Sequence, residues 1–110
     1  MIPNSNQPQD GKVLVHVDRD LEDLVADFLA NRRGDVQSLR AALASGDHET
    51  VRKLGHGMKG SGGGFGFDKI TEFGAALELA AKQSDRNAIR DCVEKLADYL
   101  ARVEVVFDEL

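Results

Sequence analysis

Residues 55–66 read Gly55-His56-Gly57-Met58-Lys59-Gly60-Ser61-Gly62-Gly63-Gly64-Phe65-Gly66, and they hold seven of the eleven glycines in a chain of 110 residues. Each glycine inside regular structure costs roughly 0.5–1 kcal/mol relative to alanine, so this concentration needs a physical reason. A loop is one reason. A surface kept free of side chains around one reactive group is another, and His56 and Lys59 are the candidates for that group.

The composition around this stretch indicates one helical domain. Aromatic residues make up only 5% of the chain, and its two prolines, Pro3 and Pro8, lie near the start. A chain of this length is long enough to bury one hydrophobic core. The formal net charge is −5, which disfavours nucleic acid as a partner because phosphate binding needs a basic surface.

The sequence carries no sign of a disulfide, a metal site or a membrane segment. Cys92 is the single cysteine, and the three histidines are dispersed, so neither a disulfide nor a metal cluster is expected. The first residues lack the basic and apolar regions of a secretory signal. No apolar run approaches the ~20 residues that span a bilayer. We therefore expect a cytoplasmic protein without a membrane partner.

A short arm is expected before the folded domain. Residues 1–11 are polar, which is typical of a flexible segment. Residues 13–17 are rich in β-branched side chains and favour extended backbone, but the pattern shows no second strand to pair with them. We interpret residues 1–17 as a flexible or extended arm lying on the domain. The alternative is an exposed edge for a partner.

From Asp18 onward, apolar residues recur with the 3.6-residue period of amphipathic helices. The predicted helices cover residues 18–45, residues 47 to about 60, a segment that begins near residue 68, and residues 84–110. Asp18, Asp47 and the pair Ser84-Asp85 are candidate N-caps, because short polar side chains accept hydrogen bonds from free backbone N–H groups. The fourth segment has the four-then-three spacing of a bundle seam, at Ile89, Val93, Leu96, Leu100, Val103, Phe107 and Leu110.

The apolar stripe of the first predicted helix is interrupted in its middle. Arg32 and Asp35 occupy positions that should face the core, and Gly34 lies between them. Either the helix kinks at this point, or the two charged side chains pair with each other three residues apart.

Four amphipathic helices joined by short loops favour an antiparallel bundle, because each helix must bury its apolar face against a neighbour. The expected fold class is all-α, an up-down-up-down four-helix bundle over residues 18–110 after a short extended arm. Phe65 and Phe67 are expected to anchor the core where the second and third helices meet. Cys92 is expected to pack as a small hydrophobic residue at the core edge.

The helical phase places His56 on the outer side of the second predicted helix. Val51, Leu54 and Met58 lie on the opposite side, so the imidazole should point to solvent. The outward side also carries Glu49, Arg52, Lys53, Lys59, Gly60 and Gly63.

An exposed imidazole beside cations has the chemistry of a phosphate carrier. A neutral imidazole has an unprotonated ring nitrogen that can act as a nucleophile. Lys59 could hold an attached phosphoryl group by charge-assisted hydrogen bonds, and Arg52 and Lys53 would extend the positive surface. Gly60 and Gly63 lack side chains, which would let another protein approach. The pattern predicts phosphate carried on a histidine and exchanged with a docked protein.

The run from His56 to Ser61, with Gly66 ten positions after His56, resembles the signature of histidine-phosphotransfer (HPt) domains. That signature is a histidine, two variable residues, Lys-Gly, five variable residues and a glycine. The resemblance covers residues 18–108, and three further segments fit the same layout: Ala42–Asp47, Leu77–Leu79 and Ser84-Asp85. The chain departs from many members at Gly62, Gly63 and Gly64, which affects where the second helix ends.

The resemblance implies a four-helix bundle without kinase or phosphatase chemistry of its own. It implies that His56 exchanges a phosphoryl group with a receiver-domain aspartate, that Lys59 supports the phosphohistidine and that Gly60 leaves the ring accessible. Mg²⁺ then belongs to the receiver domain, and this chain needs no cofactor. The implied partners are a response-regulator receiver domain, a hybrid histidine kinase or both. Nothing in the sequence demands a dimer, so a monomer is expected.

Other interpretations of the glycine-rich stretch fit the residues less well. A nucleotide-binding loop needs Gly-Lys followed by Ser or Thr after a strand, whereas the order here is Lys59-Gly60-Ser61 after a helical pattern. Residues 64–67 resemble part of an RNA-recognition strand but lack its basic residue. His16 and His48 have no comparable surroundings and are interpreted as ordinary surface residues.

Two function classes remain open. The first is a phosphocarrier in a two-component relay. The second is a non-catalytic helical interaction or scaffold domain that has kept the fold without the chemistry, in which case His56 is a surface histidine in a flexible loop.

Overall fold

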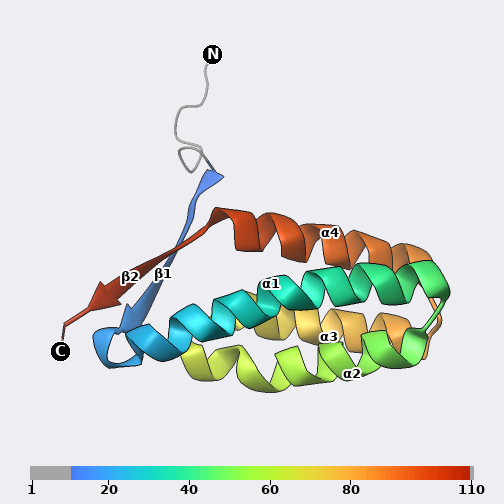
Figure 1. Cartoon of the computed structure of the whole chain (residues 1–110), viewed down its shortest axis with the longest axis horizontal. Coiled ribbons are helices and arrows are strands. Elements are labelled where there is room, and N and C mark those ends of the chain that lie inside the picture. The colour runs from blue at the N-terminus through green and yellow to red at the C-terminus, as the bar shows by residue number, and fades with distance from the viewer. Residues whose placement is uncertain (1–10, 110) are drawn as a thin grey trace, which may run out of the picture.

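Four helices lie side by side, and a pair of strands crosses the end of the bundle where the first helix begins and the last one ends (Figure 1). The computed structural model describes residues 11–109. Its helices are α1 (Glu22–Ser45), α2 (His48–Ser61), α3 (Asp68–Lys82) and α4 (Arg86–Arg102). The other elements are the strands β1 (Val13–Asp18) and β2 (Val103–Asp108) and the 3-10 turns η2 (Arg19–Leu21) and η3 (Gly63–Phe65). The predicted all-α four-helix bundle is confirmed.

Acidic caps begin the helices largely where the sequence predicts them. Asp47 accepts a hydrogen bond from the backbone N–H of Thr50 at 3.1 Å, and Asp85 accepts one from Ala88 at 3.0 Å. Asp18 caps the turn η2 instead of α1. The first helix therefore starts a few residues later than predicted, because the chain makes one tight turn before the α-helical pattern begins.

The charged interruption of α1 is a side-chain pair. The Nε of Arg32 donates to Asp35 at 2.8 Å, and both side chains are less than one fifth exposed. The guanidinium of Arg32 also lies over the ring of Phe28, 5.0 Å from its centroid. The helix runs without a break from Glu22 to Ser45, so the pairing alternative is the one that the structure shows.

The two strands correct the prediction for both ends of the domain. β1 and β2 pair in parallel, with Val13 opposite Val103 and Asp18 opposite Asp108. The prediction that the β-branched run has no strand to pair with was therefore wrong. The prediction that α4 continues through Val103 and Phe107 was also wrong, because α4 ends at Arg102. Leu110 and residues 1–10 lie outside the described residues.

The physical reason for this correction is visible in residues 103–107. Val-Glu-Val-Val-Phe satisfies the helical seam spacing, but its β-branched and aromatic side chains also favour a strand. Pairing with β1 supplies the backbone hydrogen bonds that a lone strand would lack. The strand pair is attached to the bundle, since Val17 is buried in the core and several residues of β2 pack against that core.

Aromatic side chains fill the core where α2 passes into α3. Phe67 is completely buried, and its ring stacks on Phe28 with the centroids 5.5 Å apart. The ring of Phe65 lies beside the same Phe28 ring, with the two centroids 4.8 Å apart. The predicted anchors at this junction are confirmed. Cys92 is buried beside the carbonyl of Phe73, and burial raises the pKa of its thiol to about 11, so it stays protonated at neutral pH.

Glycines allow α2 and α3 to pack with their backbones in close contact. A Cβ atom added at Gly55 would lie 2.8 Å from both the carbonyl oxygen of Gly74 and the amide nitrogen of Glu78. One added at Gly62 would lie 2.7 Å from the amide nitrogen of Thr71. Gly66 has a different structural role. It ends the turn η3 with a φ of +88°, in the left-handed region that favours glycine. Close helix packing therefore explains part of the glycine-rich stretch.

Candidate functional site

His56 lies in the middle of α2 with its side chain 66% exposed. The buried residues of α2 are Val51, Gly55 and Met58, and this apolar side turns the imidazole outward. The position agrees with the helical phase of the sequence. The helix that carries His56 begins at the Asp47 cap. The bundle therefore holds the His56 ring at its surface in a defined position.

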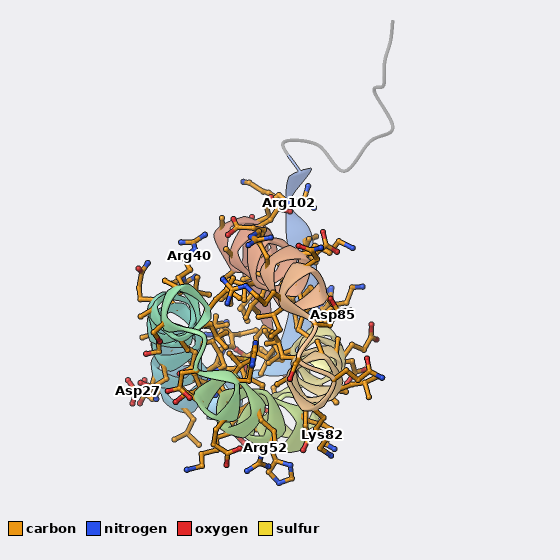
Figure 2. All side chains as sticks on the ribbon, turned by 90° about the vertical axis from the view of Figure 1, so that its right-hand side faces the viewer. Asp27, Arg40, Arg52, Lys82, Asp85 and Arg102 are labelled. Atoms are coloured by element: carbon orange, nitrogen blue, oxygen red, sulfur yellow. The ribbon has the colours of Figure 1, made fainter. Side chains whose placement is uncertain are left out.

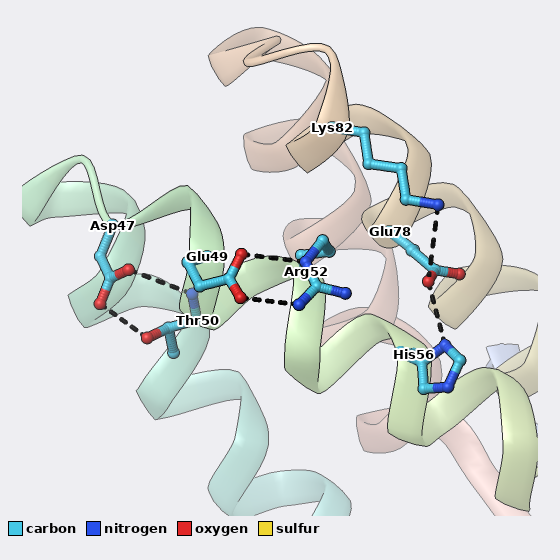
Figure 3. Close-up of polar contacts among 7 residues, drawn as sticks. All are labelled: Asp47, Glu49, Thr50, Arg52, His56, Glu78 and Lys82. Carbon is cyan, nitrogen blue, oxygen red and sulfur yellow. Dashed lines mark hydrogen bonds and ion pairs between the residues drawn. The ribbon is translucent and has the colours of Figure 1, made fainter.

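A carboxylate from the neighbouring helix contacts the ring. Glu78 of α3 lies across from His56, and the Nδ1 atom of His56 is 3.0 Å from the Oε2 atom of Glu78 (Figure 3). The Glu78 side chain is only 9% exposed. The close packing at Gly55 and Gly74 brings the two backbones near enough for this contact. Sequence reasoning assigned Glu78 no role in the site.

The Glu78 contact fixes which ring nitrogen of His56 is free. An ionised carboxylate can only accept hydrogen bonds, so Nδ1 must carry the proton of the neutral ring. Nε2 then keeps its lone pair. In Figure 3 this second nitrogen lies on the side of the ring away from Glu78. The arrangement leaves a nucleophilic nitrogen facing outward. Carboxylates that bind the other ring nitrogen orient histidine ligands at metal sites in the same way.

Lys59 binds the same carboxylate. Its Nζ atom lies 2.7 Å from the Oε1 atom of Glu78. Lys82, one turn after Glu78 on α3, has its Nζ atom 3.9 Å from Oε2. Seen along the bundle, Arg52 of α2 and Lys82 of α3 lie on the same outer side of the molecule (Figure 2). Basic side chains of both helices therefore lie on the side of the molecule that carries His56, together with the carboxylates of Glu49 and Glu78.

These contacts lower the pKa of the Glu78 carboxyl from 4.5 to about 2. The hydrogen bond from Lys59 is the largest cause, and the hydrogen bond from His56 and the charges of Lys59 and Lys82 act in the same direction. Burial opposes them, because it disfavours the charged form. Glu78 is thus a carboxylate throughout the neutral range.

The lowered pKa predicts how Glu78 contributes to acid stability. A carboxyl group with a depressed pKa in the folded state stabilises the protein above its unfolded value of 4.5, and this contribution is lost as the pH falls toward about 2. We expect Glu78→Gln to be less stable than the wild type at pH 7, with the difference shrinking below pH 4.5. Urea unfolding at a series of pH values measures it. A difference that stays constant down to pH 2 would contradict the assignment.

The other two predicted cations, Arg52 and Lys53, lie in different surroundings. Arg52 donates two hydrogen bonds to Glu49, at 2.9 and 2.7 Å. The Glu49 carboxylate therefore offsets much of its charge, and this contact lowers the pKa of Glu49 and raises that of Arg52. Lys53 is exposed on the same helix. The structure places Arg52 beside an acidic partner and not at the ring of His56.

The two predicted docking glycines lie in different surroundings. Gly60 is exposed in α2, and a Cβ atom added there would meet no atom within 4 Å. Gly63 lies in the turn η3 beyond the end of α2, where an added Cβ would make ordinary contacts with Thr71 and Asp68 at 3.8 and 3.9 Å. Internal packing therefore does not explain the missing side chain at Gly60.

The remaining histidines lie elsewhere. His16 on β1 approaches Asp108 on β2, with Nδ1 3.2 Å from Oδ1. His48 is the first residue of α2. In the described part of the chain, no three His, Cys, Asp or Glu side chains are grouped so that they could hold a metal ion.

The site consists of an outward histidine, a carboxylate at its Nδ1 atom and a lysine bound to that carboxylate. A four-helix bundle with such a site belongs to the class of helical domains built around one accessible imidazole. The chain belongs to one family of this class: the family model described as the Hpt domain matches residues 23–105. The resemblance noted from the sequence is confirmed. A search of curated proteins and a search of solved structures find no significant match.

Membership of this family supports a histidine-phosphotransfer role in phosphorelays, and Hpt domains interact with receiver domains and kinases. Among residues 11–109, none of the helices has the length and apolar character that crossing a bilayer requires.

Proposed function

We propose that the chain is a phosphocarrier in which Nε2 of His56 accepts a phosphoryl group from a receiver-domain aspartate and returns it to one. The observation that carries this proposal is the exposed His56 ring with its Nδ1 atom against Glu78. This geometry supports Nε2 as the acceptor, because it is the nitrogen that keeps a lone pair and faces solvent.

The reaction exchanges one bond for another. The lone pair of Nε2 attacks phosphorus, and the bond between phosphorus and the aspartate oxygen breaks, with its electrons leaving on the aspartate carboxylate. Both ring nitrogens are then substituted, so the imidazole gains a positive charge. The carboxylate of Glu78, 3.0 Å from Nδ1, stabilises that charge as it develops. Lys59 supports the phosphoryl oxygens by charge-assisted hydrogen bonds.

We assign the metal ion of the reaction to the partner. We expect Mg²⁺ on the receiver domain, where it offsets phosphoryl charge, and no cofactor on this chain. We further propose that the chain acts as a monomer in the cytoplasm. Gly60 and Gly63 would face the docked partner, and Lys53 and Arg52 would lie at the edge of the contact.

Transfer from a phosphorylated receiver domain tests this function. We expect incubation with a ³²P-labelled receiver and Mg²⁺ to move label to the chain, in a form that acid destroys and alkali preserves, as an N–P bond requires. Receiver domains from the source genome supply the candidate donors. Absence of transfer from every one of them would favour the alternative, a scaffold domain without the chemistry.

Gly60→Gln is expected to slow transfer about tenfold, equivalent to ~1.4 kcal/mol in the barrier. A side chain at this exposed position stands one turn from His56 and obstructs a docking partner, while glutamine is a better helix former than glycine. Rapid-quench transfer assays measure the rate, and circular dichroism confirms the helicity. Gly34→Gln is the matched control, because Gly34 is also a helical glycine with open space around it. Equal rates in both variants would remove the steric role of Gly60.

A further inference from the structure

Glu78 has two lysine neighbours that differ in how closely they bind it. Lys59 reaches Oε1 at 2.7 Å, whereas Lys82 stands 3.9 Å from Oε2. The Lys82 ammonium is more than half exposed and makes no closer ion pair among the described residues. One carboxylate is therefore held tightly by one lysine and loosely by another.

A phosphoryl group on His56 would create a competition for Lys59. The outward nitrogen Nε2 lies on the opposite side of the ring from Glu78 (Figure 3), so phosphoryl oxygens attached there offer the Lys59 ammonium acceptors that compete with Oε1. A turn of Lys59 toward them would take it away from Glu78. That movement alone would strip Oε1 of the partner it has now. Loss of a hydrogen-bond partner from one oxygen of a largely buried carboxylate is costly when water does not replace that partner.

We propose that Lys82 takes over the carboxylate of Glu78 when Lys59 turns to a phosphoryl group on His56. This inference rests on the proposed function. Lys82 follows Glu78 by four residues on α3, the spacing and order in which a glutamate and a lysine pair best on a helix. Its flexible four-carbon side chain can close the remaining gap. The exchange moves only hydrogen bonds and transfers no proton.

The exchange keeps a lysine paired with Glu78 both before and after His56 carries a phosphoryl group. Glu78 remains ionised and keeps its contact with Nδ1 of His56, so the charge that stabilises the phosphorylated ring is not lost when Lys59 leaves. Lys59 is released to the phosphoryl group without the full penalty of an unpaired carboxylate. Lys82 is therefore a positioning residue that acts through Glu78 and Lys59, and it does not itself need to touch phosphorus.

A double-mutant cycle on the lifetime of the phosphohistidine tests this exchange. The full chain is phosphorylated with phosphoramidate, which needs no docked partner, and hydrolysis is followed by ³¹P NMR in the wild type, Lys82→Gln, Lys59→Ala and the double variant. We expect Lys82→Gln to shorten the half-life about three- to tenfold. In the Lys59→Ala background the same change should shorten the half-life less than it does in the wild type, because no Lys59 is then held back from the phosphoryl group.

Lys95→Gln is the matched control, since Lys95 pairs with Asp91 on α4 at the same four-residue spacing and is remote in sequence from the site. A half-life of Lys82→Gln equal to that of Lys95→Gln would overturn the exchange. An equal loss in both backgrounds would also overturn it, by showing that Lys82 acts independently of Lys59. A wild-type chain that takes no phosphoryl group on His56 is a separate outcome, and it would remove the proposed function itself.

Discussion

His56→Gln is expected to abolish phosphoryl transfer to the chain completely. Glutamine has no ring nitrogen with a free lone pair, so no N–P bond can form at this position. The fold should remain intact, because the His56 side chain is 66% exposed and glutamine is compatible with the interior of a helix. The expected result is therefore loss of label without loss of helicity or thermal stability.

The other two histidines provide the controls for this experiment. His16→Gln on β1 and His48→Gln at the start of α2 leave the ring of His56 and its contact with Glu78 in place, and both are expected to accept label at the wild-type level. The measurement is transfer of ³²P from a labelled receiver domain, followed by gel analysis under alkaline conditions. Label retained in His56→Gln would place the acceptor elsewhere and contradict the proposed site.

Gly74→Ala is expected to cause the largest loss of stability among conservative changes in α3. A Cβ atom at this position would lie 2.6 Å from the carbonyl oxygen of Gly55 and 2.8 Å from the Cβ atom of Met58. These neighbours are backbone or belong to the core, so the helices must move apart. Overpacking of this kind costs about 1–3 kcal/mol, and separation of α2 from α3 would also lengthen the contact between His56 and Glu78.

Gly34→Ala is the matched control for the stability measurement. An added Cβ at Gly34 meets no atom within 4 Å, so this variant should gain about 0.5–1 kcal/mol from better helix propensity. Thermal and urea unfolding of both variants measures the contrast, and each kcal/mol corresponds to a shift in the melting temperature of about 4–8 °C. If Gly74→Ala is as stable as Gly34→Ala, the close packing of α2 on α3 is wrong.

Local sequence signals predicted much of the bundle. Asp47 and Asp85 begin α2 and α4 because cap preferences depend on neighbouring backbone groups only. The outward direction of His56 follows from helical phase, which is also a local property. The pairing of Arg32 with Asp35 needed a choice between two local outcomes, and only the folded structure decides between them.

Contacts between helices were beyond the reach of the sequence pattern. The role of Glu78 depends on how α3 packs against α2, which periodicity does not define. The sequence did contain one signal for this role: the acidic residue Glu78 directly follows Leu77 on the buried side of α3. The close packing at Gly55 and Gly74 was missed for the same reason: a glycine that lets two backbones meet has the same sequence signature as one in a loop.

The sequence pattern did not reveal the strand β2, because its residues fit both the helical period and a β-strand. Val103 and Phe107 fit the seam of α4, and the same segment also fits a β-branched strand. The partner strand β1 lies about ninety residues earlier in the chain, and pairing over such a separation leaves no local trace. The prediction of an arm lying on the domain nevertheless described β1 correctly, since Val17 is part of the core.

The most direct measurement is NMR of the phosphorylated chain with ¹⁵N-labelled histidine. Coupling of ³¹P to the ring nitrogens identifies the phosphorylated atom, and the attached proton identifies the other one. We predict phosphorus on Nε2 of His56 and a proton on Nδ1, held by Glu78. Phosphorus on Nδ1, or on any residue other than His56, would contradict this prediction.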